Sequence, residues 1–177
     1  MNSSLQDGIP MRGDLRVAVH DAATGLRLRR FEIRNKITFG AADVLVELLA
    51  QRELTDPEPR AGQIYSLRMG TSNTPASRAD TNLGAFAIGK RLGVVDKITG
   101  IPGELQFVAT LEAGDANGLT LQEAGLFTRG SRDAASETDA PGTTPGDVRM
   151  FARQVHPPIP KTPAITLEYS WRIAFTA

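Results

Sequence analysis

Cysteine is absent from this chain of 177 residues. Its absence excludes disulfide bonds, thiolate metal sites and cysteine nucleophiles, and it is compatible with assembly in a reducing cytoplasm. The sequence also has no apolar run of about 18 residues and no secretory apolar segment. We therefore expect a soluble chain that has no membrane partner.

An excess of charge of either sign is missing as well. Lysine and arginine total 20, aspartate and glutamate total 20, and the formal net charge is zero. This balance gives no overall attraction to nucleic acid, so we expect no nucleic-acid partner. It also leaves little self-repulsion to oppose association between copies of the chain.

Catalytic and metal-binding motifs are also lacking. The two histidines, His20 and His156, are far apart in the chain and lack the spacing of a metal site. Glu112 and Asp115 flank a turn, where acidic residues are common because of turn chemistry alone. No phosphate-binding glycine loop and no serine nucleophile motif is present. We expect no catalytic residues, metal or cofactor, and an enzyme is an alternative only if folding gathers acids, or both histidines, in a pocket.

What the sequence does contain is a strict alternation of apolar with polar or small residues over its final segment. Successive side chains of a strand point to opposite faces, so this pattern predicts a β-strand with one buried face. The predicted buried residues are Ile165, Leu167, Tyr169, Trp171, Ile173 and Phe175.

A first hairpin is predicted near the other end of the chain. Residues 14–20 and 26–33 alternate in the same way on either side of a turn at 21–25. The apolar positions change phase at Arg29 and Arg30, which is typical of a β-bulge.

The remaining patterns favour a mainly β protein, an antiparallel β-sandwich with one packed α-helix and long loops. The helix is predicted over residues 40–52, where apolar residues recur at helical spacing. Residues 1–13 form a predicted N-terminal arm, and 14–177 a single domain with an exposed loop at 130–147 that has no large apolar residue. Further strands are predicted at 65–69, 86–88, 94–95, 105–111, 119–128 and 150–155, and those at 105–111 and 119–128 are expected to pair as a second hairpin.

Three surfaces are candidate assembly interfaces. The strand at 26–33 has a basic side, which suits a protected sheet edge or contact with an acidic partner. The loop between Gly70 and Gly84 is rich in side chains that bond to nearby backbone, so it can hold a fixed shape for protein contacts. The proline-rich residues 156–163 form a stiff spacer or a surface for another subunit. The candidate interface residues are Arg29, Arg30, Arg34, Thr71, Asn73, Asp80, Pro157, Pro158 and Lys161.

Three segments, in this order, resemble bacteriophage tail-fibre, collar and baseplate proteins, especially the attachment-type domains that anchor fibres or stabilise a tail. The first is NKITFG at 35–40, which runs into the predicted helix. The second is LRMGTSNTPASRADTNLG at 67–84, and the third is EAGLF at 123–127 followed by MFAR at 150–153 and PIPKT at 158–162. The resemblance implies a structural protein of the virion that oligomerises and has no catalytic site.

We therefore expect a noncatalytic building block of a phage tail, collar or baseplate, assembled in the host cytoplasm. Its expected partners are copies of itself, as a trimer or ring, and other virion proteins. A capsid or neck decoration protein is an alternative with the same composition. A carbohydrate-binding module is another, although it needs exposed aromatics, and Tyr169 and Trp171 are in phase with the predicted buried face.

Overall fold

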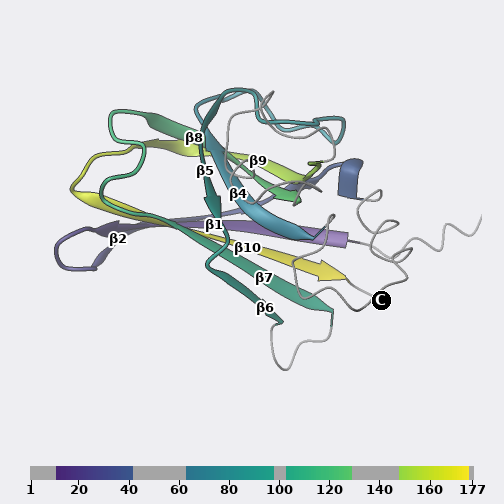
Figure 1. The fold of residues 1–177 in the computed structure, drawn as a ribbon, viewed down its shortest axis with the longest axis horizontal. Helices are drawn as coiled ribbons and strands as arrows, with labels where there is room; N and C mark the ends of the chain where they lie inside the picture. Colours follow the sequence, from purple (N-terminus) through teal and green to yellow (C-terminus); the bar gives the residue numbers. More distant parts are fainter. Residues whose placement is uncertain (1–10, 42–62, 98–102, 129–147, 176–177) are drawn as a thin grey trace, which may run out of the picture.

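The computed structural model describes residues 11–41, 63–97, 103–128 and 148–175, with the side chains of 94–97 left out. Within these residues the chain is mainly β and forms two antiparallel five-stranded sheets (Figure 1). Across the first sheet the order is β2 (Arg27–Arg34), β1 (Met11–Asp21), β10 (Ile165–Phe175), β7 (Glu104–Leu111) and β6 (Val94–Lys97). Across the second it is β3 (Lys36–Ile37), β9 (Met150–Pro160), β8 (Thr120–Thr128), β4 (Ile64–Gly70) and β5 (Phe86–Arg91).

Strand β10 is the centre of the first sheet. It pairs with β1 over the full 11 residues of both strands, and with β7 on its other side. Four residues of the predicted buried face, Leu167, Tyr169, Trp171 and Ile173, are buried, whereas Ile165 and Phe175 at the ends of the strand are half-buried. A strand with partners on both sides and one apolar face fixes the register of its neighbours.

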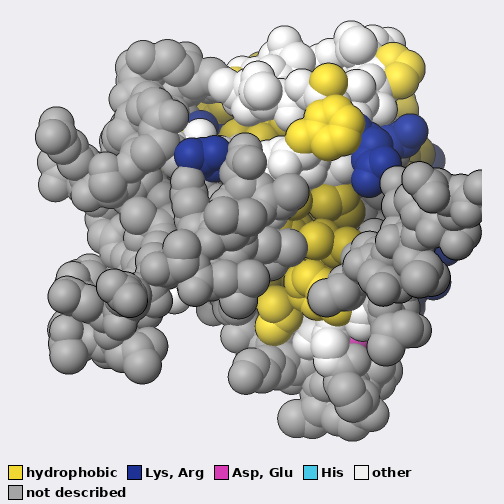
Figure 2. Space-filling model, turned by 90° about the vertical axis from the view of Figure 1, so that its right-hand side faces the viewer, with side chains coloured by type: hydrophobic (Ala, Val, Ile, Leu, Met, Phe, Trp, Pro, Cys, Tyr) yellow, Lys and Arg dark blue, Asp and Glu magenta, His cyan; other side chains and the backbone are white. Residues whose placement is uncertain are grey.

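The core lies between the two sheets. One cluster of buried side chains joins Leu15 and Trp171 of the first sheet to Leu67, Leu126 and Phe151 of the second. The antiparallel sandwich expected from the alternating patterns is therefore present. At the end seen in Figure 2, hydrophobic side chains of the described residues form a band with basic side chains at its border.

At each lateral edge of the sandwich, a short segment of the polypeptide passes from one sheet to the other. Strand β2 continues through Asn35 into β3, and the Asn35 N–H donates to the Gly13 carbonyl at 2.9 Å. Strand β5 continues through Leu92 and Gly93 into β6, with Leu92 N–H donating to the Tyr65 carbonyl at 3.0 Å. These crossings join the edge strands of the two sheets, so the architecture approaches a flattened, closed barrel and leaves less edge open.

The first predicted hairpin is confirmed, and so is its bulge. Val19 pairs with Arg29 and His20 with Arg27, so Leu28 is the extra residue. The phase change begins at Leu28, slightly before the predicted position. Leu28 is 56% exposed, because the bulge turns it away from the core.

The second predicted hairpin is wrong. Strand β7 belongs to the first sheet and β8 to the second, and residues 112–119 cross between them. A connection of this length is longer than the usual hairpin loop of about 2–5 residues, and sheets in a sandwich lie about 10 Å apart. The local pattern identified both strands correctly but did not specify their partners.

The predicted N-terminal arm is too long by three residues. Met11, Arg12 and Gly13 belong to β1 and pair with β10. Gly13 suggested an irregular segment, but it lies in the strand beneath the Asn35 side chain. Residues 1–10, most of the predicted helix at 40–52 and the whole predicted loop at 130–147 lie outside the described residues. Gly40 and Ala41 are helical at the edge of the described part, which contains no complete helix.

Candidate functional site

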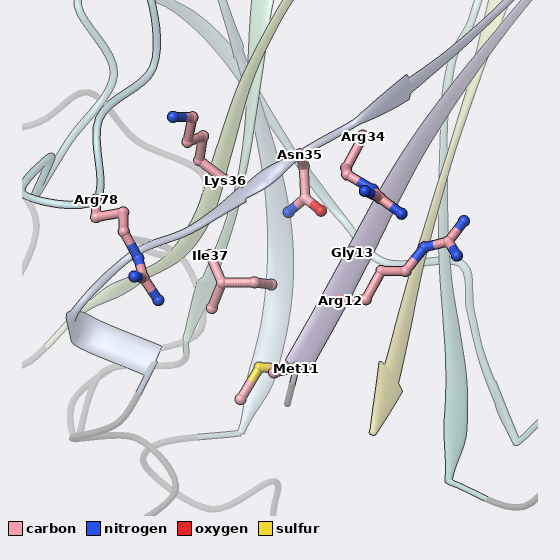
Figure 3. Close-up of a pocket in the computed structure, with 8 residues that line it drawn as sticks. All are labelled: Met11, Arg12, Gly13, Arg34, Asn35, Lys36, Ile37 and Arg78. Atoms are coloured by element: carbon pink, nitrogen blue, oxygen red, sulfur yellow. The ribbon is translucent and has the colours of Figure 1, made fainter. Parts of the chain in front are cut away.

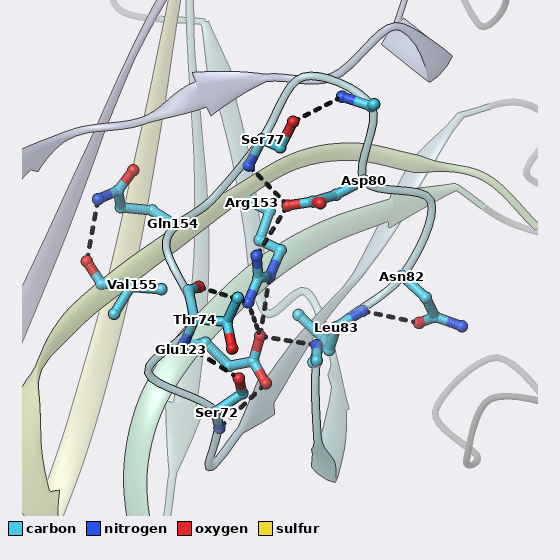
Figure 4. Close-up of polar contacts among 12 residues, drawn as sticks. Ser72, Thr74, Ser77, Asp80, Asn82, Leu83, Glu123, Arg153, Gln154 and Val155 are labelled. Atoms are coloured by element: carbon cyan, nitrogen blue, oxygen red, sulfur yellow. Dashed lines mark hydrogen bonds and ion pairs between the residues drawn. The ribbon is translucent and has the colours of Figure 1, made fainter.

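The most distinctive polar site is a buried carboxylate beneath the loop formed by residues 71–85 (Figure 4). Glu123, on β8, has no exposed surface. Its two oxygens accept backbone N–H groups from Ser72 at 3.2 Å, Gly84 at 3.0 Å and Ala85 at 2.8 Å. One side chain thus holds the beginning and the end of the loop together.

Arg153, on the neighbouring strand β9, completes the site. Its Nε donates to Glu123 Oε2 at 2.9 Å, and its other nitrogens donate to Asp80 Oδ2 at 2.7 Å and the Thr74 carbonyl at 3.0 Å. Burial lowers the pKa of Arg153, but the hydrogen bonds and charges of Asp80 and Glu123 raise it above its ordinary value. The guanidinium therefore stays charged and ties the middle of the loop to the sheet.

The loop also satisfies its own backbone, as predicted from its composition. Asp80 accepts the Ser77 N–H at 2.7 Å, and the Ser72 hydroxyl accepts the Thr74 N–H at 3.2 Å. The Thr71 N–H donates to the Ala85 carbonyl at 2.9 Å and closes the loop at its base. Local bonds of this kind give an irregular segment a defined shape.

Gly70 is required where the loop leaves β4. A Cβ atom there would lie 2.3 Å from the Ala85 carbonyl oxygen and 2.5 Å from Glu123 Oε1. Both distances are below any real contact, so a side chain at this position would displace the loop from its anchor.

The charges of this site are used for structure. Glu123 and Arg153 are each more than nine-tenths buried, and they neutralise one another. Neither is left as a free base or nucleophile. The surface that the network supports consists of exposed polar and small residues, including Asn73, Pro75, Arg78, Thr81 and Asn82. A preorganised surface binds a partner without a large cost in ordering.

The sequence did not reveal the roles of Glu123 and Arg153. The available signal was a charged residue within an otherwise apolar strand, Glu123 beside Ala124 and Arg153 beside Ala152. Opposite charges at such positions suggest a buried pair, because an unpaired charge is costly to bury.

The candidate interface residues of the loop have different environments. Asn73 is exposed and available for contact. Thr71 is half-buried, and its carbonyl accepts the Gln122 side chain at 3.0 Å. Asp80 is also half-buried, and its carboxylate is bound to Arg153. Of the three, Asn73 is the one whose side chain points to solvent without an internal role.

The basic candidates on β2 are all exposed. Arg30 donates to Glu32 at 2.7 Å, and hydrogen bonding from Arg30 together with the charge of Arg16 lowers the pKa of Glu32. Arg29 and Arg34 have no ion pair within the described residues. The basic side predicted for this strand is therefore present, with one arginine partly neutralised.

The prolines Pro157 and Pro158 are exposed near the end of β9. β3 covers only Arg153 and Ala152 of this strand, so the proline segment has β8 alone as its neighbour among the described strands. Proline has no N–H to donate, so it discourages an added strand at this edge.

Lys161 is not an exposed contact residue in this structure. It is 1% exposed, and its ammonium donates to the Ala113 carbonyl at 3.3 Å, Asn117 Oδ1 at 3.2 Å and the Thr162 carbonyl at 3.0 Å. Its position beside prolines suggested a solvated side chain. The acceptors come from a distant turn, which the local sequence did not show.

The two histidines considered for catalysis have separate surroundings, and the two acidic residues lie in a turn. His156 is buried and contacts the Tyr169 hydroxyl at 3.2 Å, whereas His20 lies beside the Gly25 carbonyl at 3.2 Å. Asp115 accepts the Glu112 N–H at 2.7 Å, which is turn chemistry as predicted. Among the described residues, no group of three or more histidines and acids is placed to hold a metal ion.

Comparisons with family models, with curated proteins and with solved structures found no match to this chain. No helix in the described ranges has the length and hydropathy that a membrane span requires.

Proposed function

We propose that this protein is a noncatalytic structural component of a bacteriophage tail, collar or baseplate. The observation that carries the proposal is the convergence of its motifs. The 67–84 segment is distant in sequence from the EAGLF and MFAR segments, yet Glu123 of EAGLF and Arg153 of MFAR both bind it. This supports the proposal because the resembling segments act as one structural unit.

The proposed mechanism is assembly through preformed surfaces. The 71–85 loop supplies a rigid polar surface, β2 a basic one, and Pro157 and Pro158 a stiff edge. Identical chains present identical patches, so a closed trimer or ring is the expected arrangement. The predicted helix at 40–52, packed beside the sheets, belongs to the same proposal. The predicted N-terminal arm and the predicted loop at 130–147 are its additional contact segments.

The alternatives predict different locations or surfaces. A capsid or neck decoration protein would use the same surfaces at another place in the particle. A carbohydrate-binding module is disfavoured, because Tyr169 and Trp171 are fully buried and cannot stack on a sugar.

Electron microscopy of phage particles with gold-labelled antibody against this chain tests the proposal. Label at the tail, collar or baseplate is the expected result, and label on the capsid or neck selects the decoration protein. Particles without label, when the chain is abundant in the soluble fraction of the same lysate, would contradict a virion role.

A further inference from the structure

A pocket of about 330 Å³ lies where the chain passes from the first sheet to the second (Figure 3). It is bounded by the start of β1, the β2–β3 crossing and the 71–85 loop. Its volume is in the usual range for ligand pockets, about 300–1,000 Å³, and exceeds the needs of a single small ion. Met11 and Ile37 contribute apolar walls.

The charged residues that line this pocket are all basic. They are Arg12, Arg34, Lys36 and Arg78, and no described carboxylate is among the lining residues. Arg12 and Arg34 lie on one side of Asn35 and Arg78 on the other, while the Lys36 ammonium points away (Figure 3). The nearby Asp14 binds Arg12 at 3.0 Å and offsets part of that charge. Arg34 and Lys36 form no ion pair within the described residues.

Asn35 supplies a second, independent indication of a ligand. It is 8% exposed, and neither its Nδ2 nor its Oδ1 has a hydrogen-bond partner. Its carboxamide occupies the space above Gly13, where a Cβ atom would lie 1.8 Å from Oδ1. Buried side-chain amides are almost always hydrogen-bonded, so this group lacks the partner that such positions normally have.

We propose that this pocket binds the carboxylate of an acidic side chain from a partner protein. Asn35 Nδ2 donates to one oxygen, and the guanidinium groups of Arg34 and Arg78 complement the negative charge. Met11 and Ile37 contact the methylene groups of the same side chain, which a free inorganic anion would leave unused. The inference rests on the proposed assembly function and defines the chemistry of one contact within it.

Isothermal titration of the full chain with a capped tetraglutamate peptide tests this proposal. The peptide is expected to bind at one saturable site, while capped tetraglutamine does not bind. Arg34→Gln and Arg78→Gln are each expected to weaken binding by about tenfold or more, because each removes a charge-assisted hydrogen bond. Arg27→Gln is the matched control, since Arg27 is exposed on the same strand but does not line the pocket. It is expected to change the affinity by less than about twofold.

Four results would overturn the inference. They are no binding of tetraglutamate, equal binding of tetraglutamine, equal losses in the Arg27 and Arg34 variants, and inorganic phosphate binding to the pocket as tightly as the peptide. Light scattering of the same samples separates this test from the proposed function. A multimer that does not bind the peptide contradicts the pocket alone, and a monomer that binds it contradicts the self-assembly.

Discussion

At the scale of single residues, Glu123 determines whether the 71–85 loop stays attached to the sheet. Glu123→Gln keeps the shape of the side chain but removes the fully buried counter-charge of Arg153, which keeps only its half-buried partner Asp80. Breaking a buried pair by removing one partner costs about 3–5 kcal/mol, and we expect a loss of that size in the free energy of unfolding, measured by urea denaturation. Glu168→Gln is the control, because Glu168 is exposed, and it should change stability by less than about 0.5 kcal/mol. Similar values for the two variants would contradict the anchoring role.

His156 gives the stability a dependence on pH. Burial lowers its pKa below the ordinary 6.5, although the Pro157 carbonyl and the charge of Glu123 partly offset this. The unfolded chain therefore binds a proton more readily than the folded one. Stability is fully present above the ordinary pKa and falls as pH drops from there through the lowered folded-state value.

Urea midpoints measured from neutral to mildly acid pH test this expectation. The wild type should lose stability through that window, and His156→Gln should show a smaller slope in the same window. Equal slopes would mean that another group controls the acid response.

Residue roles were predictable from sequence where the pattern is local. The buried face of 165–175 follows from alternation alone. The roles of Glu123, Arg153 and Lys161 did not follow, because their partners lie about 30 or more positions away in the chain. The unpartnered carboxamide of Asn35 depends in the same way on the close approach of Gly13.

At the scale of elements, β10 organises the first sheet. Trp171→Asp places an unpaired charge on its fully buried face, and the cost of such a group rivals the total stability of a domain, about 5–15 kcal/mol. We expect this variant to show no cooperative thermal transition by circular dichroism, while Glu168→Ala on the opposite face melts cooperatively. A soluble Trp171→Asp variant with a normal transition would contradict the position of this strand.

The end of β8 lies beside the start of β9, so we expect that the segment between these strands can be shortened without disturbing the fold. The Thr128 N–H donates to the Arg149 carbonyl at 3.0 Å, so the strands already meet there. Deleting 131–146 leaves four residues between Thr128 and Arg149, which suits a hairpin loop. We expect a change in Tm of less than about 4 °C, which corresponds to about 1 kcal/mol, together with weaker self-association in light scattering. A large drop in Tm would place the deleted residues in the core.

The positions of the strands followed from the sequence, but the pairing of β7 with β8 that the sequence suggested was wrong. Alternation specifies that a segment is extended and which side is buried, but not which strand lies beside it. The separation of β7 and β8 into different sheets follows from their bonding to β10 and β4, respectively. The helix at 40–52 stays a prediction.

At the scale of the whole molecule, the crossings at Asn35 and at Leu92 and Gly93 join the edges of the two sheets. Among the described residues, the surfaces proposed for assembly are a polar loop, a basic strand and a proline-rich edge. Each of these suits contact with another protein. Self-assembly through the 71–85 loop is the central part of the proposed function.

Multi-angle light scattering of the purified chain tests that claim most directly. The account predicts a trimer or larger ring for the wild type. Asn73→Glu, which adds a charge to the exposed loop, should dissociate it without changing the Tm. Thr110→Glu, at an exposed position of β7, should leave the assembly intact. A wild type that remains monomeric at all concentrations, or an Asn73→Glu variant that assembles as the wild type does, would contradict the account.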